Sequence, residues 1–361
     1  MATLRDVAEA AGVSVATVSN VFNGTGRMSP AVRLRVLDAA AGLGYAGPNA
    51  AAASLRRGSA GILGVVFGEG LRYSFDDPAA SAFLAGVGDV SEDSDVGLTL
   101  LPLPPRSGGS GPARGLGALA RAVIDGALVY SLEEDHPALS TLLARALPLV
   151  AVDGPTDVSG PPWAGLVLVS DRAAAQDAAE HVIGLGHRRA AVLVDRLTAR
   201  PRVGAVGWDE ARTATSSVMR ERMLGYTDAW AAAGLPPEEL TVNECGANTA
   251  AAGEDTMREL LRGPHPPTAV LAISDVLAVG AARAARAAGL AVPAQLSVVG
   301  FDDGPVAALH DPPLTTVRQP LREKGRQAAR MLLDALKGAP DGGRRVLPAE
   351  LVVRDSTAPA P

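Results

Sequence analysis

Several polar side chains of this 361-residue sequence stand where they could bind another molecule. In VAEAAGVSVATVSNVFNG (7–24), helical spacing places small, uncharged residues on the outer side of a short predicted helix. These outward residues are Ala16, Thr17, Ser19 and Asn20. Such a face suits the base edges of a DNA major groove better than phosphate alone. The alternative interpretation is a small packing unit rich in alanine and valine.

The elements that must position this face can be read from the flanking residues. Apolar residues recur at helical spacing at Leu4, Val7, Ala8 and Ala11. Gly12 then supplies the positive φ that ends a helix, and Ser14 can cap the next helix, expected over Val15–Phe22. That helix buries Val18 and Val21, and the small Ala8 allows the two helices to cross closely. The pattern is that of a helix-turn-helix.

A third helix is predicted to begin at Ser29-Pro30, with serine as N-cap and proline in the first turn. Its expected buried stripe is Val32, Val36, Ala39, Ala40 and Leu43. The segment PNAAAASLRRG (48–58) follows, in which Leu55 is the one large apolar residue. It is either a linker or a helix that inserts Leu55 between base steps in the minor groove.

Charge and composition limit the function classes. Residues 1–58 hold six arginines against three acidic residues, a net charge of +3 in a chain of net charge −6. The remaining 27 basic and 36 acidic residues give −9, so a basic head precedes an acidic body.

The single Cys245 excludes an internal disulfide and a cysteine-based metal cluster, and fits a structural thiol. No secretory signal or membrane-spanning run is found, which predicts a cytoplasmic protein.

Beyond residue 61, apolar runs such as GILGVVF (61–67) alternate with helical patterns such as PAASAFLAGVGDV (78–90). This alternation predicts doubly wound α/β layers with parallel strands. The pattern begins again after PPWAG (161–165), so two lobes with a cleft between them are expected. Ligands bind such sheets at the carboxyl ends of the strands, where Tyr130, Asp153 and Ser274 lie. Common catalytic motifs (GxSxG, GxxxxGK[ST], GxGxxG, HExxH) are missing from the sequence, which argues against an α/β enzyme.

The segments TLRDVAEAAGVSVATVSNVFNG, SPAVRLRVLDAAAGLGY and PNAAAASLRRG resemble the headpiece and hinge of the lactose-repressor (LacI/GalR) family of bacterial regulators. AEHVIGLGHRRAAVL, RERMLGYTDAWAAAGL, LSVVGFDD and DPPLTTVRQP resemble its effector core. The fold implied is an all-α helix-turn-helix headpiece plus an α/β periplasmic-binding-protein-like core of two doubly wound lobes. The expected domains are 1–47 (headpiece), 48–60 (hinge) and 61–361 (core). Lobe one covers about 61–161 and 319–344, and lobe two about 162–317 and 345–357.

The resemblance also implies site residues. For DNA these are Thr3, Ser14, Val15, Ala16, Thr17, Ser19, Asn20, Asn23, Leu55 and Arg56. Asn20 departs from the family, in which arginine is common; asparagine pairs best with adenine and arginine with guanine. For the effector they are Phe75, Tyr130, Asp153, Arg222, Asn248, Ser274 and Asp302.

Each effector assignment has a structural alternative. Arg222 could be an ordinary surface arginine, Asp302 or Asp275 a helix cap, and Tyr130 a core residue. His187 is interpreted as a structural turn residue. The long connection 196–218 is either a surface arm or a segment that lays Trp208 over the cleft to stack on a sugar ring.

The leading hypothesis is a non-enzymatic, homodimeric DNA-binding repressor. It would bind a near-palindromic operator under control of a sugar-like effector, without cofactor, catalytic residue, metal or membrane. The effector's identity and direction of action, the operator and its genes cannot be read from the sequence. The competing hypotheses are a pure small-molecule receptor and an α/β enzyme. A leucine heptad tail is missing, so the sequence gives no basis for a tetramer.

Overall fold

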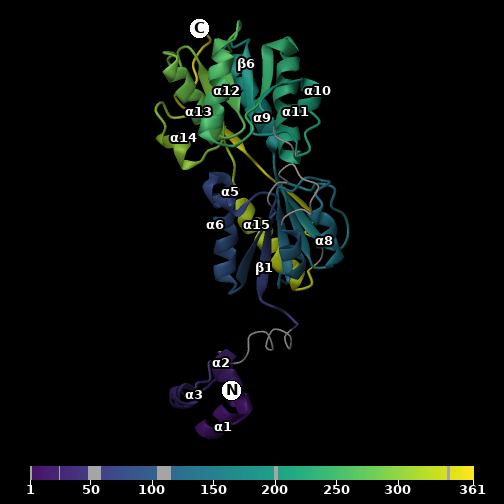
Figure 1. The fold of residues 1–361 in the computed structure, drawn as a ribbon, viewed down its shortest axis with the longest axis vertical. Coiled ribbons are helices and arrows are strands. Elements are labelled where there is room, and N and C mark those ends of the chain that lie inside the picture. The colour runs from purple at the N-terminus through teal and green to yellow at the C-terminus, as the bar shows by residue number, and fades with distance from the viewer. Residues whose placement is uncertain (1, 24, 48–57, 104–114, 199–201, 340–341) are drawn as a thin grey trace. The chain divides into compact units, whose positions relative to one another are not determined.

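The structure, a computed structural model, describes residues 2–23, 25–47, 58–103, 115–198, 202–339 and 342–361. The chain divides into two compact units, Met1–Gly61 and Ile62–Pro361 (Figure 1). Most of the expected hinge, with Leu55 and Arg56, and the loop 104–114 lie outside the described residues.

The described part of the first unit contains helices α1 (Leu4–Ala11), α2 (Val15–Asn23) and α3 (Pro30–Gly42). A capping box begins α1: the Thr3 hydroxyl accepts from the Asp6 amide, and the Asp6 carboxylate accepts from the Thr3 amide. Gly12 ends α1 at φ 63°, which a glycine adopts without strain. The Ser14 hydroxyl then accepts from the Thr17 amide at 3.1 Å and starts α2. The predicted helix-turn-helix is confirmed.

The core of this unit contains Val7, Ala8, Ala11, Val18, Val21, Val36 and Ala40. The expectation that Leu43 belongs to the buried stripe is wrong, because its side chain is 43% exposed. Leu43 is already the C-cap residue of α3, so it has left the helical repeat. Tyr45 covers this end of the core instead, with its ring edge-on to Phe22 at 5.5 Å between centroids.

The first lobe of the second unit is built on a sheet in which every paired strand is parallel, in the order β12-β5-β4-β3-β1-β2. Its strands are β1 (Ile62–Phe67), β2 (Gly97–Pro102), β3 (Gly126–Tyr130), β4 (Leu149–Val152), β5 (Trp163–Val169) and β12 (Arg344–Leu347). Its helices are α5 (Leu71–Asp76), α6 (Pro78–Asp93), α7 (Leu116–Arg121), α8 (Ala138–Ala144) and α15 (Leu321–Leu336). Apolar clusters cover both faces of the sheet, as the continuous apolar runs predict.

The second lobe has the strand order β13-β11-β10-β9-β6-β8-β7, with antiparallel β7 and β13 at its two edges. Its strands are β6 (Ala190–Val194), β7 (Gly204–Val206), β8 (Leu240–Glu244), β9 (Ala269–Ala272), β10 (Ser297–Asp302), β11 (Thr315–Arg318) and β13 (Glu350–Val352). Its α-helices are α9 (Asp171–Gly184), α10 (Trp208–Ala211), α11 (Ser217–Ala232), α12 (Ala250–Arg262), α13 (Asp275–Ala287) and α14 (Pro305–Leu309). A 3₁₀ turn spans Pro237–Glu239.

The expected boundaries between the lobes need two corrections. Strand β5 pairs with β4 and belongs to the first sheet, although the sequence pattern places it at the start of the second lobe. Strand β12 pairs with β5 and also belongs to the first sheet. Periodicity identifies a buried strand but not the sheet that it joins. The chain therefore crosses between the lobes after β5, after β11 and after β12.

Glycines allow close approach where helices pack in pairs. A Cβ atom at Gly86 of α6 would lie 1.9 Å from the carbonyl oxygen of Arg322 in α15. A Cβ atom at Gly325 of α15 would lie 2.2 Å from the carbonyl oxygen of Phe83 in α6. The two helices thus touch through their backbones, which fixes α15 against the first lobe. Across the described residues, none of the helices is long and apolar enough to cross a membrane.

Candidate functional site

Helix α2 of the first unit packs through one face and leaves the other free. Val18 and Val21 are buried, whereas Val15, Ala16 and Asn20 are exposed. The side-chain oxygen of Asn20 accepts a hydrogen bond from the Thr25 hydroxyl at 3.2 Å, which holds the amide at the end of the helix. The face is short and uncharged and is therefore able to approach base edges.

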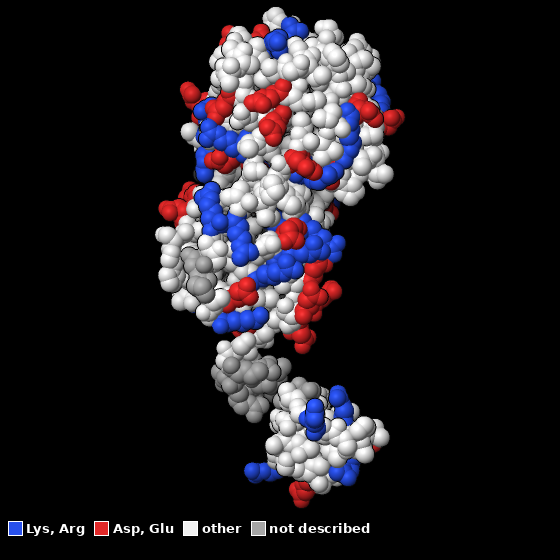
Figure 2. All heavy atoms as spheres, turned by 180° about the vertical axis from the view of Figure 1, so that it is seen from behind, with Lys and Arg blue, Asp and Glu red and all other residues white. Residues whose placement is uncertain are grey.

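The remaining predicted DNA contacts lie around this face or outside the described residues. Thr17 and Ser19 are half-buried on α2, and Asn23 is its last residue. The Ser14 hydroxyl shares a 2.8 Å hydrogen bond with that of Thr17, and Thr3 is exposed at the start of α1. Basic side chains and a few acidic ones are visible on the surface of this unit, and acidic and basic groups are intermixed on the second (Figure 2).

The second unit contains a cavity of about 140 Å³ between its two lobes. Six of the seven predicted effector residues line it: Tyr130, Asp153, Arg222, Asn248, Ser274 and Asp302. Phe75 does not, because its side chain is 59% exposed on α5. Tyr73, two residues earlier on the same short helix, lines the cavity in its place. The structure therefore does not bring Phe75 to the cavity.

Arg222 is buried in α11, so the surface-arginine alternative is wrong. Its Nε donates to Asp171 Oδ1 at 2.8 Å, and Nη1 donates to the carbonyl oxygen of Ile273 at 2.7 Å. The guanidinium carbon lies 3.6 Å from the ring centroid of Phe301. These contacts from three elements fix the guanidinium plane at the cavity wall.

Asp302 ends β10 at φ 112°, an unusual conformation for a residue with a side chain. Its carboxylate accepts from the Gln319 amide at 2.6 Å. Burial raises its pKa well above the ordinary value, although Arg222 opposes this shift. The next helix, α14, is capped by Gly304, so the helix-cap alternative for Asp302 is wrong.

Asp153 follows β4 and faces Lys324 of α15. Asp153 Oδ2 accepts from Lys324 Nζ at 2.5 Å, and both side chains are almost completely buried. Asp153 Oδ1 is buried with no hydrogen-bond partner among the described residues. Tyr130 lies beside this pair, stacked on Phe83 at 4.3 Å between centroids, so it both packs in the core and lines the cavity.

Ser274 and Asn248 connect the lobes. The Ser274 hydroxyl caps α13 and donates to Asn248 Oδ1 at 2.6 Å. The Asn248 amide donates in turn to Asp77 Oδ1 in the first lobe at 3.4 Å. Burial raises the pKa of Asp77. Both predicted residues are therefore already part of a polar chain across the cleft.

Further contacts join the lobes around the cavity. Arg196 forms an ion pair with Glu69, and the Ser217 hydroxyl donates to the carbonyl oxygen of Asp153. The Thr215 hydroxyl donates to Glu133 at 3.1 Å. Each of these contacts joins a residue of the first lobe to a residue of the second lobe. The structure therefore describes an arrangement in which the lobes touch across the cleft.

Sequence reasoning missed several residues of this wall: Glu69, Tyr73, Asp77, Glu133, Asp195, Arg196, Gln319 and Lys324. Lys324 carried a usable signal, because the whole chain has only two lysines and this one lies in a helix with an apolar face. Asp195 directly follows the apolar run of β6, the position where sheets of this kind bind ligands.

The interpretation of Trp208 as a lid is wrong. Its indole nitrogen donates to the carbonyl oxygen of Leu240 at 2.9 Å, and its ring packs on the core of the second lobe. Strand β7 and helix α10 thus attach the described part of the long connection to the sheet edge.

The structural interpretation of His187 is confirmed. Its ring nitrogens form hydrogen bonds with the hydroxyls of Thr268 and Ser297 at 2.9 and 3.0 Å.

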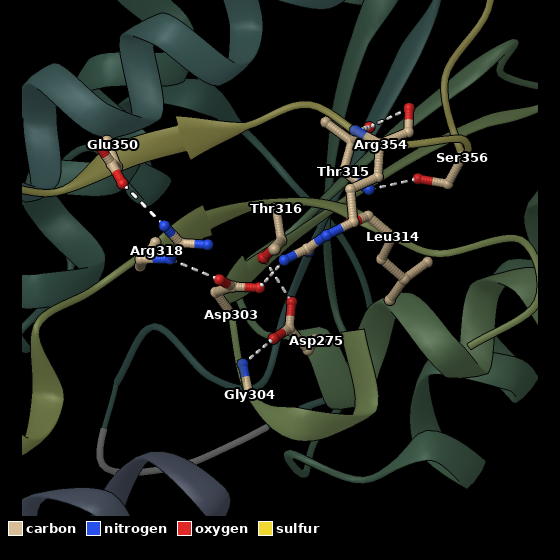
Figure 3. Close-up of polar contacts among 10 residues, drawn as sticks. All are labelled: Asp275, Asp303, Gly304, Leu314, Thr315, Thr316, Arg318, Glu350, Arg354 and Ser356. Carbon is tan, nitrogen blue, oxygen red and sulfur yellow. Dashed lines mark hydrogen bonds and ion pairs between the residues drawn. The ribbon is translucent and has the colours of Figure 1, made fainter. Parts of the chain in front are cut away.

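Asp275 is the first residue of α13 and belongs to a polar network behind the cavity (Figure 3). Its carboxylate accepts from the Gly304 amide at 2.7 Å and from the Thr316 hydroxyl at 2.5 Å, so it links three elements rather than capping its own helix. Burial raises its pKa to about 6, against the lowering effect of Thr316 and Gly304. Neighbouring Asp303 pairs with Arg318 and Arg354 at 2.7 and 2.6 Å, which ties β10 to β11 and to the segment after β13.

Comparisons with known proteins agree with both units. The family model described as bacterial regulatory proteins, lacI family, matches residues 3–49, and that of a periplasmic binding protein-like domain matches 179–357. The HTH-type transcriptional regulator Rv3575c of Mycobacterium tuberculosis is 41% identical over 92% of this chain and 90% of its own.

Two solved structures extend this agreement to the whole fold. The lac repressor dimer bound to operator and the anti-inducer ONPF is 27% identical, with a TM-score of 0.78 over 99% of both chains. The complex of the transcriptional regulator CelR with cellobiose is 32% identical, with a TM-score of 0.68 over 99% of this chain and 100% of that one.

Proposed function

Because the chain belongs to the lacI family of bacterial regulatory proteins, which are DNA-binding transcriptional regulators and not enzymes, we propose that it is a ligand-controlled repressor. A homodimer binds a near-palindromic operator, and a small sugar-like molecule bound between the lobes sets the affinity. The proposed location of the protein is the cytoplasm, on the DNA of the nucleoid. The resemblance stated above is confirmed at the level of the family.

The first unit is proposed to read the operator through the free face of α2. Val15, Ala16 and Asn20 are exposed there while the opposite face is held in the core. Asn20 would contact an adenine, because a carboxamide matches the adenine N6 and N7 groups. A two-fold dimer presents two such helices and therefore two half-sites. Leu55 and Arg56 are proposed to contact the minor groove, and this part rests on the family resemblance alone.

The observation that carries the effector proposal is the cavity between the lobes. It brings Arg222 and Asp302 of the second lobe together with Tyr130 and Asp153 of the first. A ligand that bridges these groups binds the closed arrangement better than an open one, which is the differential affinity that a switch needs. The complex of the similar regulator CelR with cellobiose supports a sugar as the ligand class.

The test is operator binding by the full chain. Operator sequences are selected from random duplex DNA, and affinity is measured by fluorescence anisotropy between 50 and 200 mM salt. We expect a near-palindromic consensus, an affinity that falls by orders of magnitude as salt rises, and a stoichiometry of two chains per duplex. A sugar that changes the affinity supports the switch and shows its direction. Failure to select any sequence would refute the proposed function.

A further inference from the structure

The cavity cations are already engaged by protein groups. Arg222 uses Nε for Asp171 and Nη1 for Ile273, so two of its three guanidinium nitrogens hold the protein together. Tight binding of a carboxylate or phosphate by arginine uses two parallel N–H groups on one edge of the fork. The edge that contains Nε is occupied here. Arg222 is therefore poorly placed to clamp an anion.

The two other basic groups of the wall are neutralised as well. Lys324 Nζ is held by Asp153 Oδ2, and Arg196 pairs with Glu69. Each of these cations has its counter-charge within the protein. An anionic ligand would have to displace a carboxylate from one of them.

The carboxylates of the wall outnumber these cations. Asp77, Glu133, Asp195 and Asp302 also line the cavity and form no ion pair among the described residues. Asp195 Oδ1 and Asp153 Oδ1 are buried without any hydrogen-bond partner in the described part of the chain. Unsatisfied buried acceptors are rare in proteins and mark places where a ligand or water completes the bonding.

From these contacts we infer that the cavity selects an uncharged polyhydroxyl ligand and excludes phosphorylated or carboxylated ones, with Asp195 and Asp153 accepting hydrogen bonds from ligand hydroxyls. The inference rests on the proposed function, because it specifies the effector of that same site. Asp195 acts as a specificity-determining residue: a hydroxyl completes its bonding, whereas an anion is repelled by it. Burial raises the pKa of Asp195; a bound anion would raise this pKa further, whereas hydrogen bonds from ligand hydroxyls would stabilise the carboxylate.

The experiment is a thermal-shift and calorimetric comparison of matched compounds on the full-length protein. Ribose is compared with ribose 5-phosphate, glucose with glucose 6-phosphate and glucuronate, and cellobiose with cellobionate. We expect stabilisation by an uncharged member and at least tenfold weaker binding of its charged partner. In Asp195→Asn, we expect the affinity for the uncharged compound to fall about tenfold. The ratio of its affinity to that of the charged partner should also become smaller. Asp177→Asn, which removes one exposed charge from α9, should change neither.

Two results would overturn the inference alone: a charged member that binds as tightly as its uncharged partner, or an uncharged ligand whose affinity is unchanged in Asp195→Asn. If no compound in the panel stabilises the protein while operator binding is intact, the sugar-effector part of the proposed function fails, and this inference fails with it. Circular dichroism of Asp195→Asn without ligand checks that the variant is folded.

Discussion

Arg196 of the second lobe and Glu69 of the first form an ion pair at the wall of the cavity. Both side chains are largely buried, so solvent screens the pair less than it would at the surface. Burial raises the pKa of Glu69, and the attraction of Arg196 only partly offsets this. The pair therefore helps to hold the lobes together.

Glu69→Gln should shift the lobes toward an open arrangement, because the amide removes the charge that attracts Arg196. We expect the ratio of closed to open protein to fall about fivefold, as for the loss of roughly 1 kcal/mol. Spin labels at Arg121→Cys and Arg262→Cys, in a Cys245→Ser background, report the distance between the lobes. Glu254→Gln, which removes an ion pair within α12, is the control and should leave the distance distribution unchanged.

Arg222→Ala should weaken both stability and effector response. The substitution leaves Asp171 buried without its cation, and loss of one partner from a buried pair costs about 3 kcal/mol or more. Denaturant unfolding measures the loss of stability, and a thermal shift measures the response to whichever sugar of the panel binds the wild type. Arg262→Ala removes an exposed arginine from the same lobe and should alter neither quantity. If the sugar-induced thermal shift is unchanged in Arg222→Ala, Arg222 does not bind the effector.

Asn20→Ala should relax base preference at one operator position in each half-site. Loss of a bidentate contact costs about 1–3 kcal/mol for the preferred base, while the salt dependence stays the same because no phosphate contact is removed. Selection from random DNA with the wild type and the variant measures the change. If the variant instead loses affinity equally for all sequences, Asn20 contacts the DNA backbone and not a base.

Gly86→Ala should destabilise the protein by about 3 kcal/mol, because the new methyl group would collide with the backbone of Arg322. Gly88→Ala lies two residues further along α6, and nothing lies within 4 Å of its Cβ position. It should be neutral or stabilising by up to about 1 kcal/mol, since alanine is the better helix former. Equal effects in the two variants would contradict the close contact between α6 and α15.

The raised pKa of Asp275 predicts a pH dependence of stability. With an ordinary value of 3.8 and a folded value of about 6, the carboxyl group binds more protons in the folded state between these limits. Its contribution to the free energy of unfolding therefore falls as pH rises through that window, by roughly 2 kcal/mol. Urea unfolding from pH 4 to 7 should show the stability of the wild type falling relative to Asp275→Asn. Asp209→Asn, an exposed control, should show no such trend relative to the wild type.

The sequence predicted the elements better than their assembly. Capping residues such as Ser14 and Ser29 act locally, so the start of a helix can be read from a few neighbours. The sheet that β5 joins depends on contacts with β4 and β12, of which the second lies about 180 residues away. Periodicity contains no information on that choice.

The cavity wall shows the same limit. Tyr130, Asp153 and Ser274 were found because they follow apolar strands, and Arg222 and Asp302 because they match a family motif. Glu69 and Gln319 were missed because they lie on a loop and on the crossing into α15, where no local pattern points to the cleft. Lys324 lies within α15, and only its rarity in this chain distinguishes it. Phe75 and Tyr73 lie on the same short helix, α5. Packing decides which of the two side chains faces the cavity, and the sequence alone does not show this.

The pairing of β12 with β5 also determines the order in which the chain can fold during synthesis. Residues of β1 to β5 leave the ribosome early, yet their sheet lacks an edge strand and the cover of α15 until residue 347 is made. The second lobe emerges later and is completed by β13, which ends at residue 352, and by Ser356, which bonds to β10 and β11. The two sheets are therefore completed within a few residues of each other, and a chain cut short after residue 320 contains no complete lobe.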